Sequence, residues 1–129
     1  MAEQGSAGYS GAMDRIWFAL GALAGLGTVA LAAAAAHLRL DPAATQALRD
    51  GVQMQGLHAV ALLICGVRGG RWCNFAGSFF TLGLLFFCGA VYIRVFGVGI
   101  PTSGVAPFGG VMLMVGWLML LLAAFKRRR

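Results

Sequence analysis

The sequence predicts an all-α integral membrane protein, a bundle of four transmembrane helices with both termini in the cytoplasm. The chain of 129 residues is 60% hydrophobic and only 11% charged, whereas a soluble domain is nearer half apolar and a quarter charged. Too few polar groups remain to coat a surface that faces water, so we expect lipid to cover much of the chain. One domain is expected over residues 15–125, with spans at about 16–36, 51–67, 72–93 and 108–125.

The first predicted span, residues 16–36, carries no charge. Its 21 residues reach about 31 Å as a helix, at roughly 1.5 Å per residue, which is enough for a hydrocarbon core of about 30 Å. The segment before it, residues 1–14, is small and polar with three glycines, so we expect a flexible tail. A signal peptide cut before His37 is an alternative for the span, but its length favours a membrane anchor.

The second predicted span, residues 51–67, is short, with only eight uninterrupted apolar or glycine residues at 59–66. Upstream of it, Asp41 and Pro42 form a helix-start signal, with Asp as the N-cap and Pro in the first turn. The residues that follow are good helix formers. We therefore expect a helix that begins near Pro42, outside the membrane core, and runs unbroken to about Val67.

The third and fourth predicted spans, residues 72–93 and 108–125, contain no charge and are long enough to cross a bilayer. The sequence RGGR joins the second span to the third and predicts a tight turn. Residues 94–107, rich in glycine and proline, predict a loop without regular structure before the fourth span. The basic sequence KRRR, residues 126–129, is expected to form a short cytoplasmic tail.

A stripe of mostly polar side chains follows the third predicted helix in steps of three and four residues. Its members are Ser78, Thr81, Leu85, Cys88 and Tyr92. We expect such a stripe to face the interior of the bundle. A pathway for protons or ligands is the alternative, but it is less favoured because none of these side chains titrates near neutral pH.

The positively charged residues predict the orientation in the membrane. Four spans put both termini on one side, and seven of the ten Lys and Arg residues fall on that side. Positive residues favour the cytoplasm, so both termini are expected there. Trp17 and Trp72 would then lie near the cytoplasmic interface, as in an aromatic belt. The seven are Arg15, Arg68, Arg71 and residues 126–129; the other three are Arg39, Arg49 and Arg94.

Two glycine pairs, Gly21 with Gly25 and Gly66 with Gly70, have the GxxxG spacing that lets transmembrane helices pack closely. With 20 glycines in 129 residues, chance alone predicts about three such pairs, so the motif adds no support for a dimer. We expect these glycines to pack within the chain.

Polar residues open the second span, in the stretch QMQGLHAVALLICG. On a helical wheel Gln55 lies about 60° from His58, whereas Gln53 lies about 140° away, toward the opposite face. A polar side chain at this depth needs a hydrogen-bond partner. The expected partners lie at the outer end of the bundle: Tyr92, Arg94, His37 and the loop residues Thr102 and Ser103.

Two interpretations of these polar groups compete. In the structural one, Gln55 and His58 form hydrogen bonds across helices, each contributing about 0.6 kcal/mol. In the functional one, His37 and His58 bind a metal or a haem, or His58 relays protons or binds a quinone head group. Two histidines without an acid or a cysteine nearby supply fewer ligands than a metal site usually has. We therefore favour the structural interpretation and expect no cofactor. The functional interpretation would use His37, Gln55, His58, Tyr92 and Arg94.

Several classes of function lack their usual residues in this sequence. The four acidic residues lie outside the predicted spans, and there is no phosphate-binding loop, nucleophile elbow or pair of carboxylates. The net charge of +6 gathers at the ends of spans, where it meets anionic lipid rather than nucleic acid. Cys65, Cys73 and Cys88 form no disulfide framework. We expect a non-enzymatic accessory or structural component, whose partners are the lipid bilayer and other membrane proteins.

Four motifs, taken together, carry a family resemblance. They are AAAAAH ending at His37, QMQGLHAVALL with Gln53, Gln55 and His58, CGAVY with Gly89 and Tyr92, and GVAPFGGVMLMVGW with Pro107, Gly109, Gly110, Gly116 and Trp117. In order and spacing, over residues 13–124, the chain resembles the YgdD-like family of small inner-membrane proteins, a domain-of-unknown-function family with eukaryotic relatives. The resemblance implies a four-helix membrane protein with no established enzymatic activity and no known cofactor.

The chain departs from the family pattern at three places. Alanines precede His37 where the family often has glycines, and Leu57 precedes His58 where it often has an aromatic residue. Ala90 and Val91 stand where the family tends to have Ser-Leu. A site lined by these positions would be altered in this chain.

Overall fold

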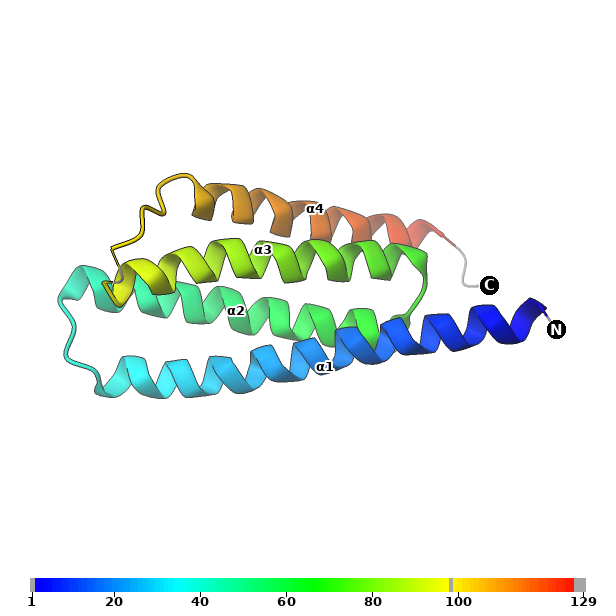
Figure 1. Cartoon of the computed structure of the whole chain (residues 1–129), viewed down its shortest axis with the longest axis horizontal. Helices are drawn as coiled ribbons and strands as arrows, with labels where there is room; N and C mark the ends of the chain where they lie inside the picture. Colours follow the sequence, from blue (N-terminus) through cyan, green and yellow to red (C-terminus); the bar gives the residue numbers. More distant parts are fainter. Residues whose placement is uncertain (1, 98, 127–129) are drawn as a thin grey trace.

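The computed structural model describes residues 2–97 and 99–126, and their side chains from residue 11 onward. Four α-helices follow one another: α1 (Ala2–His37), α2 (Pro42–Arg68), α3 (Arg71–Val95) and α4 (Val105–Phe125). They run alternately up and down, so the start of α1, the α2–α3 turn and the end of α4 lie at one end, here named the terminal end (Figure 1). The α1–α2 and α3–α4 loops lie at the opposite, or loop, end.

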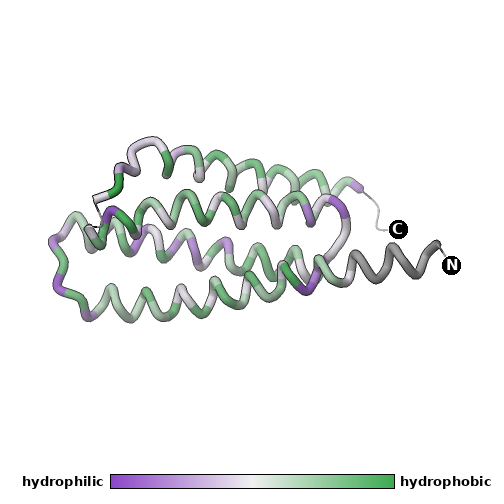
Figure 2. The backbone as a smooth tube through the Cα atoms, viewed as in Figure 1, coloured by the Kyte–Doolittle hydropathy of each residue, from purple (hydrophilic) through white to green (hydrophobic). Residues whose placement is uncertain are grey.

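All four helices are long and apolar enough to cross a membrane. Hydrophilic residues gather at the helix ends and along part of α2, while most other residues of the helices are hydrophobic (Figure 2). Over residues 2–97 and 99–126 the chain forms no β-strand. The predicted fold class, an all-α four-helix membrane protein, is therefore confirmed.

The first helix starts earlier than the sequence predicted. The segment expected as a flexible tail is helical from Ala2, so the structure differs from the expected boundary near residue 15. Once a span is helical, each preceding residue can join it for one more hydrogen bond without a new nucleation cost. Ala, Glu, Gln and Met, which occur among these residues, all favour this extension.

The second helix begins at Pro42, as predicted. Asp41 is its N-cap, and the carboxylate of Asp41 accepts the backbone N–H of Ala44 at 2.7 Å. At the terminal end, Gly69 and Gly70 have φ angles of +67° and +97°. Glycine adopts this conformation without steric cost, which is why RGGR can reverse the chain within so few residues.

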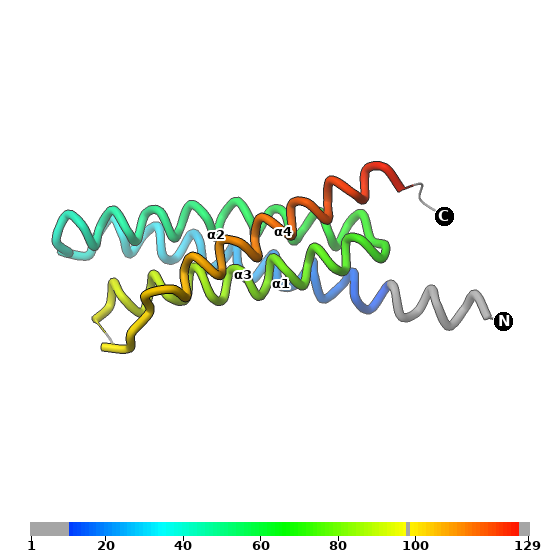
Figure 3. The backbone as a smooth tube through the Cα atoms, turned by 90° about the horizontal axis from the view of Figure 1, so that it is seen from above, coloured from blue at the N-terminus to red at the C-terminus, as the bar shows by residue number. Residues whose placement is uncertain are grey.

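The helices pack in chain order, with α2 and α3 in the middle, α1 against α2 and α4 against α3 (Figures 1 and 3). Within the described residues α1 approaches α3 only lightly, and its backbone does not approach α4. A closed square bundle would pack α1 against α4; among the described residues that contact is missing, so the bundle stays open, with α1 and α3 only lightly in contact.

Glycines bring α1 and α2 together. A Cβ added to Gly21 would lie 2.8 Å from the carbonyl oxygen of Ala59, and one added to Gly66 would lie 2.8 Å from that of Asp14. These contacts confirm that one glycine of each GxxxG pair packs within the chain. A Cβ at either of the other members, Gly25 and Gly70, would meet no atom within 4 Å.

Trp17 lies inside the bundle, so its expected place in an aromatic belt is wrong. The residue is only 5% exposed, and its ring packs against Gly77 of α3. The indole Nε1 donates to the Oδ1 of Asn74 at 2.9 Å. A buried indole N–H needs an acceptor, and Asn74 supplies one from the neighbouring helix. This contact ties α1 to α3 near the terminal end.

Candidate functional site

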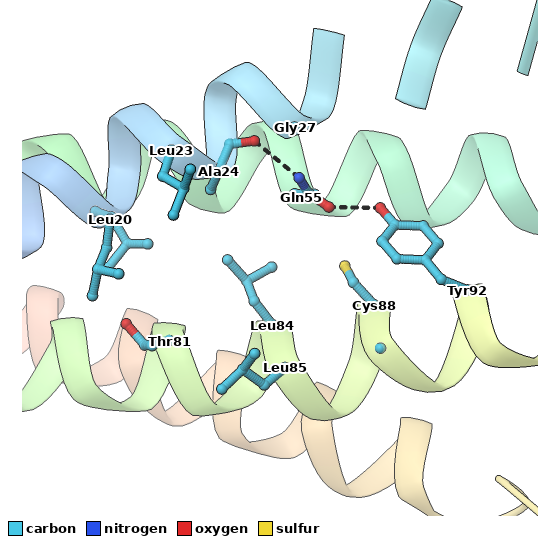
Figure 4. Close-up of a pocket in the computed structure, with 12 residues that line it drawn as sticks. Leu20, Leu23, Ala24, Gly27, Gln55, Thr81, Leu84, Leu85, Cys88 and Tyr92 are labelled. Atoms are coloured by element: carbon cyan, nitrogen blue, oxygen red, sulfur yellow. Dashed lines mark hydrogen bonds between the residues drawn. The ribbon is translucent and has the colours of Figure 1, made fainter. Parts of the chain in front are cut away.

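Gln55 joins three helices through its side chain. Its amide Nε2 donates to the carbonyl oxygen of Ala24 in α1 at 2.9 Å, and its Oε1 accepts the hydroxyl of Tyr92 in α3 at 2.7 Å (Figure 4). Gly27 makes room for the amide, because a Cβ there would lie 2.9 Å from Nε2. Both ends of the carboxamide are thus used between helices.

His58 is enclosed by aromatic rings and is only 2% exposed. Its Nδ1 lies 2.7 Å from the carbonyl oxygen of Met54, and the indole of Trp117 in α4 donates to its Nε2 at 3.0 Å. A carbonyl can only accept, so Nδ1 carries the proton and Nε2 is the acceptor of a neutral ring. The rings of Phe80 and Trp117 meet it edge-on, with centroids 5.4 and 5.9 Å away.

The helical wheel predicted part of this arrangement. Gln53 is exposed, away from the other two polar residues, as expected. Gln55 and His58 nevertheless serve different neighbours, since Gln55 bonds to α1 and α3 while His58 bonds to α4. Tyr92 was correctly expected as a partner, but it bonds to Gln55.

Trp117 was missed as the partner of His58. The available signal was chemical, because an indole N–H inside a membrane span needs an acceptor and few acceptors occur in these spans.

The structure does not bring His37 and His58 together. His37 is exposed at the end of α1. His58 lies sixteen residues beyond the start of α2 at Pro42, hence roughly 24 Å from the loop end at 1.5 Å per residue. Over the described part of the chain, no group of three or more His, Cys, Asp or Glu side chains could hold a metal ion. The pair expected by the functional interpretation is therefore not assembled here.

Arg94 lies apart from the polar residues of α2. It is exposed and lines a cavity of about 470 Å³ at the loop end, together with Thr102 and Ser103 of the α3–α4 loop. Its place near that loop was expected, but it forms no hydrogen bond with Gln55 or His58.

A lateral groove lies between α1 and α3, with α2 behind it (Figure 4). Its volume is about 430 Å³. On the groove rim, Leu23 and Leu85 are 64% and 65% exposed, so the groove opens sideways. The described residues that line it carry no charge. They include Leu20, Leu23 and Gly27 of α1, Gln55 of α2, and Leu85 and Tyr92 of α3.

The polar stripe of the third helix faces this groove. Thr81, Leu85, Cys88 and Tyr92 line it, whereas Ser78 is exposed outside it. The expectation that the whole stripe faces the interior is therefore wrong. A helical period gives a common face, but the separation of α1 from α3 leaves that face partly uncovered.

The part of the chain that contains Gln55, His58 and Tyr92 is similar in sequence to known proteins. The model of a family described as "Protein of unknown function (DUF423)" matches residues 31–110, more than half of the chain. The chain belongs to this family. The matched region includes Gln55, His58 and Tyr92.

Relatives of the DUF423 chain align along nearly its whole length. The UPF0382 membrane protein SAB0533 of Staphylococcus aureus (strain bovine RF122 / ET3-1) is 33% identical over 84% of this chain and 91% of its own. The UPF0382 membrane protein of Haemophilus influenzae is 29% identical over 90% and 98%. The UPF0382 inner membrane protein YgdD of Escherichia coli (strain K12) is 27% identical over 90% and 94%.

No solved structure matches the chain significantly. The family and its relatives confirm the resemblance to YgdD-like proteins. Together with the four apolar helices, they make this chain a multi-pass membrane protein.

Proposed function

We propose that this DUF423 protein is a non-enzymatic accessory component of the inner membrane, which binds other membrane proteins through α1. The polar side chains of its spans support the non-enzymatic part. The carboxamide of Gln55 and the Nε2 of His58 form hydrogen bonds with other helices, while the Nδ1 of His58 bonds to the Met54 carbonyl of its own helix. Each bond between helices contributes about 0.6 kcal/mol, which suits a structural role.

The single observation that carries the partner proposal is the outward face of α1. At 100° per residue, five exposed residues fall on one side of this helix, opposite the glycine that packs on α2. They are Ala19, Ala22, Leu26, Ala30 and Ala33.

Small side chains let a second helix approach closely, which is how helices associate where lipid gives no hydrophobic drive. The span of α1 is also the least covered of the four: in its most hydrophobic stretch 11% of the residues are buried, against 39% in that of α2. The occupant proposed for this face is a transmembrane helix of a partner protein.

A pair of matched substitutions tests the partner proposal. Ala30→Leu enlarges the outward face, whereas Ala32→Leu makes the same change at another exposed position about 160° away around the helix. Full-length tagged variants are purified from membranes in mild detergent, and co-purifying membrane proteins are quantified with isotope labels. A true partner should fall about tenfold in Ala30→Leu, a loss of about 1.4 kcal/mol, and stay unchanged in Ala32→Leu. Equal recovery in both variants would contradict the proposal.

The proposal also places both termini in the cytoplasm. Arg15, Arg68, Arg71 and Lys126 lie at the terminal end, and residues 127–129 follow Lys126 in the sequence with three more positive charges, which makes seven of the ten positive residues. Arg68 has a packing role there as well, since its guanidinium Nη2 donates to the carbonyl oxygen of Ala123 near the end of α4 at 2.7 Å. Positive charge near a helix C-terminus is favourable, so this contact stabilises the last turn of α4.

A further inference from the structure

The lateral groove is a space that the fold keeps open. Trp17 packs against Gly77 toward the terminal end, and the Gln55–Tyr92 bond crosses toward the loop end. Gly89 stands in the wall between them, and a Cβ added there would meet no atom within 4 Å. The glycine at position 89 is therefore not explained by close helix packing, unlike those that touch a neighbouring backbone.

The bilayer is the medium that reaches this groove. Its rim residues Leu23 and Leu85 are exposed in the middle of membrane spans, so an occupant would enter from the lipid. The groove volume of about 430 Å³ falls within the roughly 300–1,000 Å³ of pockets that hold small ligands. Its described lining carries no charge, so a charged head group would lose water there without a partner.

One hydrogen-bond donor remains at the polar end of the groove. The Gln55 amide has two N–H groups, of which one donates to Ala24. The second N–H has no acceptor among the described residues, and an unsatisfied donor inside a membrane is costly. The Tyr92 hydroxyl already donates to Gln55, so it can only accept from an occupant. A head group that accepts a hydrogen bond would therefore satisfy the free N–H of Gln55 in this groove.

The depth of this donor narrows the class of occupant. Gln55 lies five residues beyond Asp50 in α2, hence roughly 8 Å further into the membrane than that charged residue, at 1.5 Å per residue. The ester and phosphate groups of a phospholipid stay in the interfacial region, outside the hydrocarbon core. A head group that reaches this depth must be small and uncharged.

We propose that the lateral groove binds a prenylated quinone. An uncharged quinone head has carbonyl oxygens that can accept the second N–H of Gln55, and its single aliphatic tail matches the apolar wall formed by Leu20, Leu84 and Leu85. This site is separate from the outward face of α1 and from His37 and His58.

Decylubiquinone, a short-tailed quinone, provides the probe. The full-length protein is purified in mild detergent, and the fraction that carries one quinone is followed by native mass spectrometry over a titration. Gly89→Leu fills the groove and should weaken binding about tenfold or more, equivalent to about 1.4 kcal/mol. Gly25→Leu is the matched control, because a Cβ there also meets no atom within 4 Å but Gly25 does not line the groove. Its binding should equal that of the natural chain.

Two further arms keep the test decisive. Thr81→Leu fills the groove from its other end and should also weaken binding. This second variant guards against the case in which Gly89→Leu disturbs the helix itself. Among the described residues, the Thr81 hydroxyl bonds to the Gly77 carbonyl of its own helix, so its loss breaks no bond between helices. Decylbenzene, which has a tail but no carbonyl, should bind several-fold more weakly than the quinone. Equal quinone binding by the filled variants and the control would overturn the proposal, as would equal binding of decylbenzene or displacement of the quinone by phosphatidylethanolamine. None of these changes lies on the outward face of α1, so the result of this test is independent of the test of the partner proposal.

Discussion

Several polar side chains within the spans bond to other helices, whereas the hydroxyls of Thr28, Ser78 and Thr81 bond to carbonyls of their own helix. Trp117 shows how two interactions combine in one residue. Its ring packs edge-on against Phe80 with centroids 5.3 Å apart, while its N–H bonds to His58. A protonated His58 would turn Nε2 into a donor that faces the indole N–H, so the observed geometry requires the neutral ring. The pair therefore acts as a tie between α2 and α4.

Removal of the indole N–H should weaken this tie. Trp117→Phe keeps an aromatic ring against Phe80 but leaves Nε2 of His58 without its donor. We expect a loss of about 0.6 kcal/mol in the free energy of unfolding, up to about 1.7 kcal/mol, the range found for hydrogen bonds between membrane helices. Reversible unfolding in mixed micelles measures this difference.

Trp72→Phe is the matched control, because the Trp72 ring packs on Phe75 and the described residues give its N–H no acceptor. Its cost should be smaller. In a double-mutant cycle with His58→Phe, the extra cost of Trp117→Phe should disappear. A Trp117→Phe variant as stable as Trp72→Phe would show that the bond contributes nothing.

At the scale of elements, glycines bring α3 and α4 into backbone contact. A Cβ added to Gly109 would overlap the backbone nitrogen of Phe87 and lie 2.9 Å from the carbonyl oxygen of Gly83. Further along, a Cβ on Gly116 would lie 2.6 Å from the ring of Phe80. The Pro-x-Gly-Gly motif, residues 107–110, therefore has a packing role at the start of α4.

Adjacent glycines of this motif should respond differently to the same change. Gly109→Ala forces α3 and α4 apart, because backbone atoms cannot move aside as a flexible side chain can, and we expect a loss of about 1–3 kcal/mol. Gly110→Ala places its methyl 3.8 Å from the Phe87 ring, an ordinary contact, and should change stability by about 0.5 kcal/mol or less. Unfolding curves of the two variants in detergent measure both values, and equal destabilisation would rule out the backbone contact as the cause.

For the whole molecule, the open arrangement of helices separates three surfaces. α1 packs on α2 by one side, faces the lateral groove by a second and presents its small residues outward by a third. A square bundle would have covered at least one of these surfaces. The proposed partner face and the proposed quinone site both depend on this openness.

The proposed orientation can be tested on the whole chain. A phosphatase that is active only outside the cytoplasm should be inactive when fused after Arg129 and active when inserted at Ser103 in the α3–α4 loop, because positive residues hold the terminal end inside. Enzyme activity normalised to the amount of fusion protein measures this. The reverse pattern would overturn the orientation, and activity at both sites would show that α4 does not cross the membrane.

The sequence by itself determined the features that depend on local chemistry. Four uncharged or weakly charged apolar runs determined four membrane spans, because the hydrocarbon core sets the length of a helix that crosses it. Asp41 and Pro42 determined where α2 begins, since the cap bonds only to its own first turn. The wheel separated Gln53 from Gln55 because the helical period is a local property.

Only the tertiary structure decided which helices meet and by which faces. It paired Gln55 with Tyr92 and His58 with Trp117, although both polar residues start from a similar side of α2. It buried Trp17 and left Leu85 exposed. A helical period gives the direction of a side chain around its own axis, but the rotation and separation of neighbouring helices depend on small residues that lie far apart in the sequence. The groove between α1 and α3 arises from that separation, so no single segment could predict it.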